Sequence, residues 1–379
     1  MEILTNAAVY TPLEVIRPGT VCLEGERIVR VLPGVTKKGE DLKGRIVAPG
    51  FVDLHIHGYR GHDTNTGTAE TLLSLARELP RFGVTAFIPT TVTAPHEELL
   101  QISRAVAGAM KIQREGPQGA RILGLELEGP YINREKKGAQ NPEFIREPSW
   151  DEFLEYWRAS QGHIRTITVA PEVPGALEFI ERAVALGVRV SLGHTNASYE
   201  EARAAIAAGA SRATHLFNAM PPLHHRHPGA VAACLESRSV YLELIADLVH
   251  VSAPMLCLVW RLAGPGRVAL ITDAIPAAGL PDGDYSLGGL RVRVRDGVPR
   301  LEDGALAGSS LTMDQAVRNA ISLGVPLQEA LMMASYTPAR ACGEADIGLL
   351  RPGNKADLIV LNPESLAVER VYLGGRRLL

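Results

Sequence analysis

Eight short apolar runs, rich in β-branched residues, recur along the middle of the chain and constrain its fold more than any other feature. They cover residues 51–57, 85–92, 121–129, 164–172, 188–195, 213–220, 240–247 and 268–274. Continuous apolar runs of this length are typical of parallel strands that are buried on both faces. Segments with helical spacing separate them, and this alternation predicts an α/β fold, a (β/α)8 barrel of the TIM type.

Two of the connecting segments carry clear helix signals. In residues 96–110, apolar residues recur at the spacing of one helix face. Further along, Ser198 and Glu201 have the spacing of a capping box, and Gly209 is a typical stop signal. Both segments are therefore expected to be helices that lie between barrel strands.

The two ends of the chain share a different pattern. Residues 1–50 and 345–379 contain short alternating runs separated by turn residues, which is typical of β-strands. Neither end has enough strands for an independent sheet, which needs three or more. We therefore expect both ends to form one small β-sandwich domain, and residues 51–344 to form the catalytic barrel. Within the barrel, residues 281–303 predict an inserted β-hairpin, or strands that join the small domain.

Composition and charge exclude several classes of function. The chain has 39 basic and 42 acidic residues, and this balance argues against an extended nucleic-acid or membrane surface. No apolar run reaches the roughly 18 residues that a spanning helix needs, and the first residues lack a secretory signal. The four cysteines show no metal-binding spacing and are expected to be free thiols, so we expect a cytoplasmic protein.

Polar residues with metal-ligand chemistry stand at or near the ends of five of the eight runs. They are His55, His57, Glu128, His194, His215 and Asp273. In this type of barrel the C-terminal strand ends form one rim, where active sites lie. Each residue alone has a plainer explanation, such as a polar strand end, a loop cap or a helix N-cap. Their agreement favours a metal site, and nitrogen and oxygen ligands of this kind suit zinc or iron.

Ordinary metal chemistry suggests how these residues divide their roles. A catalytic zinc site keeps three protein ligands and one open position, and Glu128, His194 and His215 provide such a set. A carboxylate outside that set can take a proton from the attacking water and return it to the leaving group, as expected of Asp273. The two histidines of the first run would then hold a second metal. The expected reaction is hydrolysis of an amide-like bond.

Longer motifs carry a more specific resemblance. The segments PGFVDLHIHG, LELEGPYIN, KKGAQNP, SLGHTNA, THLFNAMPP, ITDA, LAGSSLTM and GNKADLIVL extend almost from end to end. Together they resemble the N-acetylglucosamine-6-phosphate deacetylases of the amidohydrolase superfamily. The resemblance implies a metal-bearing barrel with a small β-sandwich from both termini. It also implies that Glu128, His194 and His215 hold the main metal and that Asp273 is the general base and then the general acid.

The resembled family binds a sugar phosphate, and the matching positions extend to that part of its site. Arg226 and His250 match its phosphate-binding cations, one of which can come from a neighbouring subunit, so a homodimer is expected. A planar arginine fork suits phosphate, although a solvated basic loop is the plainer interpretation of this segment. The other matching substrate contacts are Ala139, Gln140, Asn218, Ala219, Ala307, Gly308 and Ser309.

Two positions depart from the family's common pattern. Gln140 stands where a histidine that polarises the acetyl carbonyl is common. Glutamine donates a hydrogen bond but carries no positive charge, so electrophilic help is expected to rest more on the metal. Leu248 stands where glycine is usual, which is expected to affect the loop before His250.

The expected function is therefore metal-dependent release of acetate from N-acetylglucosamine 6-phosphate, which leaves glucosamine 6-phosphate. One alternative is the same reaction on N-acetylgalactosamine 6-phosphate, because the sequence does not separate an axial from an equatorial hydroxyl. Another is a cyclic-amide hydrolase, although such enzymes commonly bridge two metals with a carboxylated lysine, and Glu128 occupies that strand position here. A non-catalytic scaffold is disfavoured, because such proteins usually lose ligands and this chain keeps every one.

Overall fold

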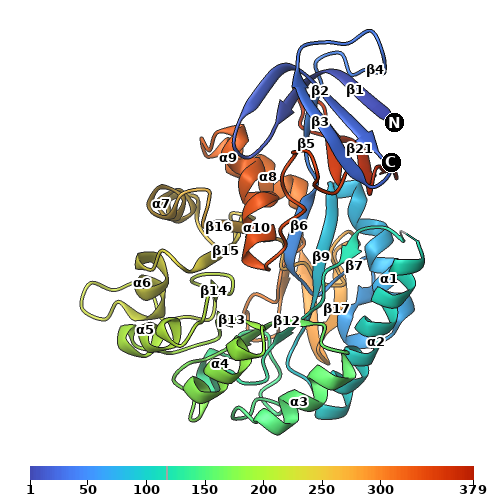
Figure 1. Cartoon of the computed structure of the whole chain (residues 1–379). Coiled ribbons are helices and arrows are strands. Elements are labelled where there is room, and N and C mark those ends of the chain that lie inside the picture. The colour runs from blue at the N-terminus through green and yellow to red at the C-terminus, as the bar shows by residue number, and fades with distance from the viewer. Residues whose placement is uncertain (117) are drawn as a thin grey trace.

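The barrel predicted from the sequence is confirmed by the computed structural model, which describes residues 1–116 and 118–379 (Figure 1). Its strands pair in parallel with their neighbours. A short extra strand, β10 (Arg121–Ile122), also pairs with β9. In order around the barrel the strands are β6 (Phe51–Ile56), β9 (Val84–Thr91), β11 (Leu125–Glu128), β12 (Ile164–Val169), β13 (Arg189–Leu192), β14 (Arg212–Ala213), β15 (Tyr241–Ile245) and β16 (Val268–Ile271).

The first and last barrel strands meet through hydrogen bonds at their C-terminal ends. The Asp273 N–H donates to the His55 carbonyl at 2.9 Å, and the His57 N–H donates to the Ala274 carbonyl at 2.8 Å. The buried carboxylate of Asp53 accepts bonds from the backbone and the hydroxyl of Thr272 at 3.2 and 2.6 Å. The segments that carry the H-x-H motif and Asp273 are therefore neighbours in space.

Helices connect the strands and cover the outside of the barrel (Figure 1). They are α1 (Ala69–Glu78), α2 (His96–Glu115), α3 (Trp150–Ala159), α4 (Ala176–Ala185), α5 (Tyr199–Ala207), α6 (Gly229–Glu236), α7 (Ala253–Ala263), α8 (Met313–Ser322), α9 (Leu327–Ala334) and α10 (Tyr336–Ala341), with 3-10 turns at Thr64–Thr66, Leu79–Phe82 and Arg134–Lys136. The predicted capping box is confirmed, because Ser198 and Glu201 exchange side-chain and backbone hydrogen bonds at the start of α5.

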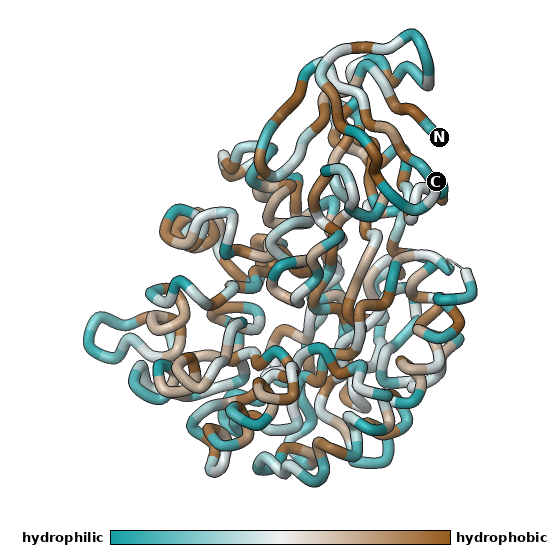
Figure 2. The backbone as a smooth tube through the Cα atoms, in the orientation of Figure 1, coloured by the Kyte–Doolittle hydropathy of each residue, from teal (hydrophilic) through white to brown (hydrophobic). Residues whose placement is uncertain are grey.

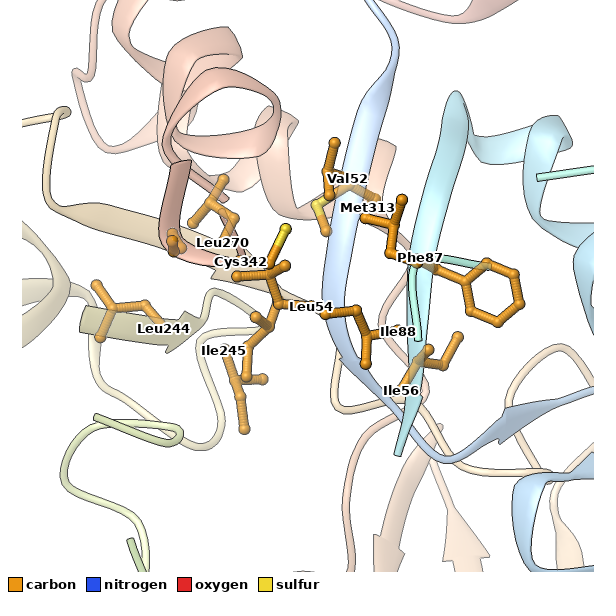
Figure 3. Packing of buried hydrophobic residues seen from close by; sticks show 14 of the residues in the cluster. Val52, Leu54, Ile56, Phe87, Ile88, Leu244, Ile245, Leu270, Met313 and Cys342 are labelled. Carbon is orange, nitrogen blue, oxygen red and sulfur yellow. The ribbon is translucent and has the colours of Figure 1, made fainter. Parts of the chain in front are cut away.

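The apolar core of the barrel joins strands to helices. Leu54 of β6, Ile88 of β9 and Leu270 of β16 gather in it with Met313 of α8 (Figure 3). The four cysteines are free, as expected, and Cys257 alone among them is half-buried while the others are buried. Among the residues that the structure describes, no helix combines the length and apolar character that crossing a membrane requires.

The two ends of the chain pair into one mixed sheet at the top of Figure 1, as the sequence predicts. Its order is β22-β21-β20-β5-β1-β2-β3, with β4 beside β1. The bounds are β1 (Glu2–Tyr10), β2 (Val15–Glu24), β3 (Arg27–Pro33), β4 (Glu40–Asp41), β5 (Ile46–Pro49), β20 (Leu358–Leu361), β21 (Val368–Leu373) and β22 (Arg376–Arg377). The division into two folding units after residue 50 and before residue 345 stays a prediction.

Period-two alternation in β20 explains how this sheet attaches to the barrel. Leu358 and Val360 belong to the sheet's own apolar core, whereas Ile359 and Leu361 belong to the barrel core. Successive side chains of a strand point to opposite faces. The strand is therefore buried on both faces and fixes the terminal sheet against the barrel.

The insertion forms a three-stranded antiparallel sheet of its own and does not pair with the terminal sheet. It comprises β17 (Gly283–Leu287), β18 (Leu290–Arg295) and β19 (Val298–Arg300), while another short pair, β7 (Gly58–Tyr59) and β8 (His62–Asp63), follows the first barrel strand. In β18, Val292 and Val294 pack on Ile275 beside the barrel mouth, and the arginines that alternate with them are exposed. Of the two expectations, the separate hairpin is the one observed, extended by a third strand.

Candidate metal centre and active site

All six rim residues predicted from the sequence lie together in a buried cluster at the C-terminal ends of the strands. The Glu128 Oε1 atom lies 2.8 Å from His215 Nε2 and 3.0 Å from His194 Nε2. Across the cluster, Asp273 Oδ1 lies 3.1 Å from His57 Nε2 and 3.5 Å from His55 Nε2. The barrel therefore brings residues 218 positions apart in sequence, from 55 to 273, onto one rim.

Two histidines of the cluster have a tautomer that suits a bound cation. His57 Nδ1 lies 3.1 Å from the Thr90 carbonyl, and His194 Nδ1 lies 2.8 Å from the Lys136 carbonyl. A carbonyl only accepts hydrogen bonds, so each Nδ1 carries the proton and a neutral ring turns its Nε2 lone pair toward a carboxylate oxygen. Such facing acceptors repel unless a cation lies with them. The donor set therefore fits a divalent metal.

The electrostatics of the cluster also favour positive charge. Burial raises the pKa of the Glu128 carboxyl, but His55 and His194 outweigh it and hold that pKa well below its usual value. Burial lowers the pKa of His55, yet the carboxylates of Glu128 and Glu126 raise it to about 10. Burial raises the pKa of the Asp273 carboxyl, but the neighbouring imidazoles of His57 and His55 outweigh this effect, and the pKa is lowered. The carboxylates are therefore ionised at neutral pH.

Two groups of three ligand atoms lie within 4.8 Å of one another, His55 with His57 and Asp273, and His55 with Glu128 and His215. His55 is common to both. His194 belongs to neither group, although its Nε2 is within 3.0 Å of Glu128. Clusters suited to a metal are thus present, and they overlap at His55.

The backbone at the strand ends adopts conformations that L-residues rarely take. His194, His215 and Asp273 have φ angles of 48°, 29° and 51°. Left-handed backbone costs a non-glycine residue about 1–3 kcal/mol and concentrates at functional sites. The strand ends turn sharply there, and the strain falls on residues that carry the ligand atoms.

A cavity of about 270 Å³ opens on the cluster. Eleven of the residues predicted from the sequence line it: His57, Glu128, Ala139, Gln140, His194, His215, Asn218, Ala219, His250, Asp273 and Gly308. Val92, Gly138, Leu287, Ala305 and Leu306 complete the lining. The polar cluster therefore forms part of one ligand-sized cavity.

The other four predicted residues do not line the cavity. His55 lies fully buried within the histidine and carboxylate cluster, and Ala307 lies in the core under the insertion. The Ser309 backbone N–H donates to the Asp273 carbonyl at 2.8 Å, and its hydroxyl donates to the Thr272 carbonyl, so it supports the Asp273 turn. Arg226 is exposed in the loop between β14 and α6, where it donates to His225 at 2.9 Å. That loop projects at the far left of Figure 1 and is largely hydrophilic in Figure 2.

Comparison with known proteins places the chain in a family. The model of the amidohydrolase family matches residues 46–378. The chain belongs to the amidohydrolase family. It is 40% identical over 330 residues to N-acetylglucosamine-6-phosphate deacetylase of Vibrio furnissii, covering 86% of this chain and 82% of that protein. It is 42% identical over 335 residues to N-acetylgalactosamine-6-phosphate deacetylase of Escherichia coli, covering 87% of each.

A solved structure agrees with these relatives over the whole chain. A mutant N-acetyl-D-glucosamine-6-phosphate deacetylase from Mycobacterium smegmatis, in complex with N-acetyl-D-glucosamine-6-phosphate, matches with a TM-score of 0.94 and 37% sequence identity. The match covers 100% of this chain and 99% of that one. The resemblance drawn from the sequence motifs to this group of amidohydrolases is confirmed.

Gln140 of this amidohydrolase has its amide engaged within the protein. Its Nε2 donates to Glu128 Oε2 at 2.6 Å, and its Oε1 accepts from the Thr93 N–H at 2.6 Å. One Glu128 oxygen is thereby held by Gln140, while the other faces His194 and His215. Gln140 thus orients Glu128, and a contact of Gln140 with an acetyl carbonyl stays a prediction.

Sequence reasoning missed several residues that support the site. Asp247 accepts from His250 Nδ1 at 2.6 Å and fixes that ring beside the cavity. This contact could have been predicted from the sequence, because Asp247 and His250 stand only three residues apart. The Lys136 and Thr90 carbonyls fix two candidate ligand histidines, but backbone acceptors leave no trace in a sequence. Leu287 of the insertion reaches the cavity only through tertiary packing.

Proposed function

We propose that this amidohydrolase removes the acetyl group of N-acetylglucosamine 6-phosphate to give glucosamine 6-phosphate and acetate. The observation that carries the proposal is a single cavity. Its lining includes histidines and carboxylates that suit a bound cation, together with His250 and Asn218. Two features support it further. A relative in Vibrio furnissii bears the name of that activity, and a similar solved structure holds that substrate.

The proposed metal site uses the rim ligands. Glu128, His194 and His215 would hold a divalent metal, zinc with iron as the alternative, and His55 with His57 would hold a second one. A cation bound there would act as a Lewis acid toward water and toward the acetyl carbonyl. The overlap of the two ligand groups at His55 supports either one or two ions per chain.

Asp273 is the proposed proton carrier. Because its pKa is lowered, it is ionised at neutral pH and accepts a proton as the water oxygen adds to the acetyl carbon. It then donates that proton to the sugar nitrogen as the carbon–nitrogen bond breaks, which releases the amine and acetate. His57 Nε2 lies 3.1 Å from Asp273 Oδ1, which places this carboxylate beside the proposed metal ligands.

The phosphate end of the substrate is proposed to lie at His250. Asp247 accepts a hydrogen bond from Nδ1 of that ring, so Nε2 is the ring nitrogen that remains to contact a ligand. Arg226 does not line the cavity of its own chain, and we propose that it serves a neighbouring subunit in a homodimer. A cytoplasmic location is part of the same proposal.

N-acetylgalactosamine 6-phosphate is the second candidate substrate. The relative in Escherichia coli that bears this name is 42% identical to the chain. The two sugars differ only in the orientation of one hydroxyl, so both belong in the same test.

The test is acetate release from both phosphorylated sugars and from unphosphorylated N-acetylglucosamine, before chelation, after chelation and after metal return. Metal-dependent turnover restricted to phosphorylated sugars is expected. Turnover of no sugar would refute the proposed substrate, and turnover that survives verified metal removal would refute the proposed chemistry. The ratio of kcat/KM between the two epimers decides between the candidate substrates.

A further inference from the structure

A charged network lies fully buried in the barrel behind the metal ligands. Arg212 of β14 donates from Nε to Glu243 Oε1 at 2.6 Å and from Nη2 to Glu126 Oε2 at 3.0 Å. Its Nη1 donates to the Thr166 hydroxyl. All three charged side chains have no exposed surface. Burying one positive and two negative charges is costly unless they are paired, and barrel filling alone needs only apolar side chains.

The network faces the one ligand histidine that both candidate metal groups share. His55 Nδ1 lies 3.7 Å from Glu126 Oε1 and 3.8 Å from Glu243 Oε2. Both His55 Nδ1 and Glu243 Oε2 are buried without a hydrogen-bond partner. A buried ring nitrogen and a buried carboxylate oxygen without partners each carry a desolvation cost. An approach of roughly 1 Å would bring them to hydrogen-bond distance.

We propose that Glu243, held in place by Arg212, is a positioning residue that accepts the His55 Nδ1–H and thereby directs Nε2 to the metal. This inference rests on the metal site of the proposed function. His57 and His194 achieve the same orientation with backbone carbonyls, as their Nδ1 contacts show. A carboxylate partner makes the imidazole a stronger ligand than a carbonyl does. Arg212 keeps the two carboxylates apart and compensates their charge.

The first test compares two variants of the full-length protein for Zn²⁺ affinity by chelator competition and for metal content after dialysis. Glu243→Gln keeps the side-chain volume and removes the charge. Thr166→Val, the matched control, removes a contact to Arg212 and touches no ligand histidine. Loss of a partner of this kind weakens metal binding about tenfold to a hundredfold. We expect that loss for Glu243→Gln alone, with unfolding temperatures of the two metal-free variants alike.

The outcomes separate this inference from the proposed function. Equal affinity in wild type and Glu243→Gln, with deacetylation intact, would overturn the inference alone. Affinity lost equally in both variants would assign the network to barrel packing and would also overturn it. Absence of metal binding in the wild type would overturn the proposed function and the inference together.

A second measurement needs no variant and remains available if Glu243→Gln does not fold. Long-range ¹H–¹⁵N spectra of the zinc-loaded wild type report which nitrogen of each histidine carries a proton. A proton on His55 Nδ1, with Nε2 in the range of a metal-bound nitrogen, is expected. A proton on His55 Nε2 would overturn the inference. A network with only a structural role would not favour one His55 tautomer over the other.

Discussion

The barrel and the terminal sheet bury very different interiors. The barrel encloses the ion network of Arg212, Glu126 and Glu243 beneath the candidate metal ligands, whereas the terminal sheet has an apolar core that includes Leu4 and Leu358. Buried charge contributes little to stability, while buried aliphatic surface contributes about 25 cal/mol per Å². The contrast teaches that buried charge is placed next to the candidate site, whereas the core of the terminal sheet is built from aliphatic contacts.

The largest expected effect is a loss of turnover at the barrel site. Asp273→Asn keeps the size of the side chain but removes the proton acceptor. General acid–base catalysis contributes about a hundredfold to ten-thousandfold, and kcat is expected to fall by that range. Steady-state acetate release measures the loss, and Zn²⁺ affinity should change less than kcat.

The control for this variant is Ser310→Ala. Ser310 does not line the cavity, and its hydroxyl donates to the Gly297 carbonyl. It should retain wild-type kcat. Unchanged turnover in Asp273→Asn would remove this carboxylate from the proton-transfer role, whatever the metal content of the variant.

The second largest effect is a loss of stability in the terminal sheet. Leu358→Ala removes a fully buried side chain from the small apolar core, and such truncations cost about 2–5 kcal/mol of unfolding free energy. Because this core contains no metal ligand, kcat and metal affinity at 25 °C should be unchanged. Denaturant unfolding, with acetate release below the transition, measures both quantities.

Leu13→Ala is the matched control, because the same truncation at a side chain that is 69% exposed should change stability by less than about 0.5 kcal/mol. A loss of metal affinity in Leu358→Ala would show that the terminal sheet also shapes the site. The division of roles between the two sheets would then be wrong.

A smaller effect is expected at the lining of the cavity. Gln140→Ala leaves Glu128 Oε2 without its 2.6 Å donor, so the carboxylate is less well oriented. Removal of such a supporting contact lowers metal affinity or activity about tenfold to a hundredfold, and the lower end is expected because the other Glu128 oxygen keeps its neighbours. Chelator competition and kcat/KM report the change.

Gln140→Glu provides the comparison for that variant. It adds a second carboxylate beside Glu128, and repulsion should make it worse than alanine. Equal metal affinity in wild type and Gln140→Ala would show that Glu128 is held by its histidines alone.

The sequence predicted the rim but not the network behind it. His55, Glu128 and Asp273 were predictable because every parallel strand of a barrel ends on the same rim. Arg212 and Glu243 were not, because each stands at the start or middle of a strand and acquires its partner only through barrel closure. The pairing of both termini followed from strand count, while the separate sheet of the insertion depended on packing against Ile275.

The smallest expected effect concerns the loop that presents His250. Leu248 has a φ angle of 67°, a left-handed conformation that glycine adopts without cost, so the leucine keeps a glycine-like backbone. Leu248→Gly should relieve about 1 kcal/mol of strain and lose a similar amount through the greater freedom of the unfolded chain. Stability should therefore change by less than about 1 kcal/mol, and kcat/KM should change less than about twofold because the Asp247–His250 bond remains.

The control is Leu248→Ala, which loses the same exposed side chain but keeps the strain. The glycine variant should therefore unfold at no lower denaturant concentration than the alanine variant. The reverse order would mean that alanine adopts this left-handed turn without measurable strain.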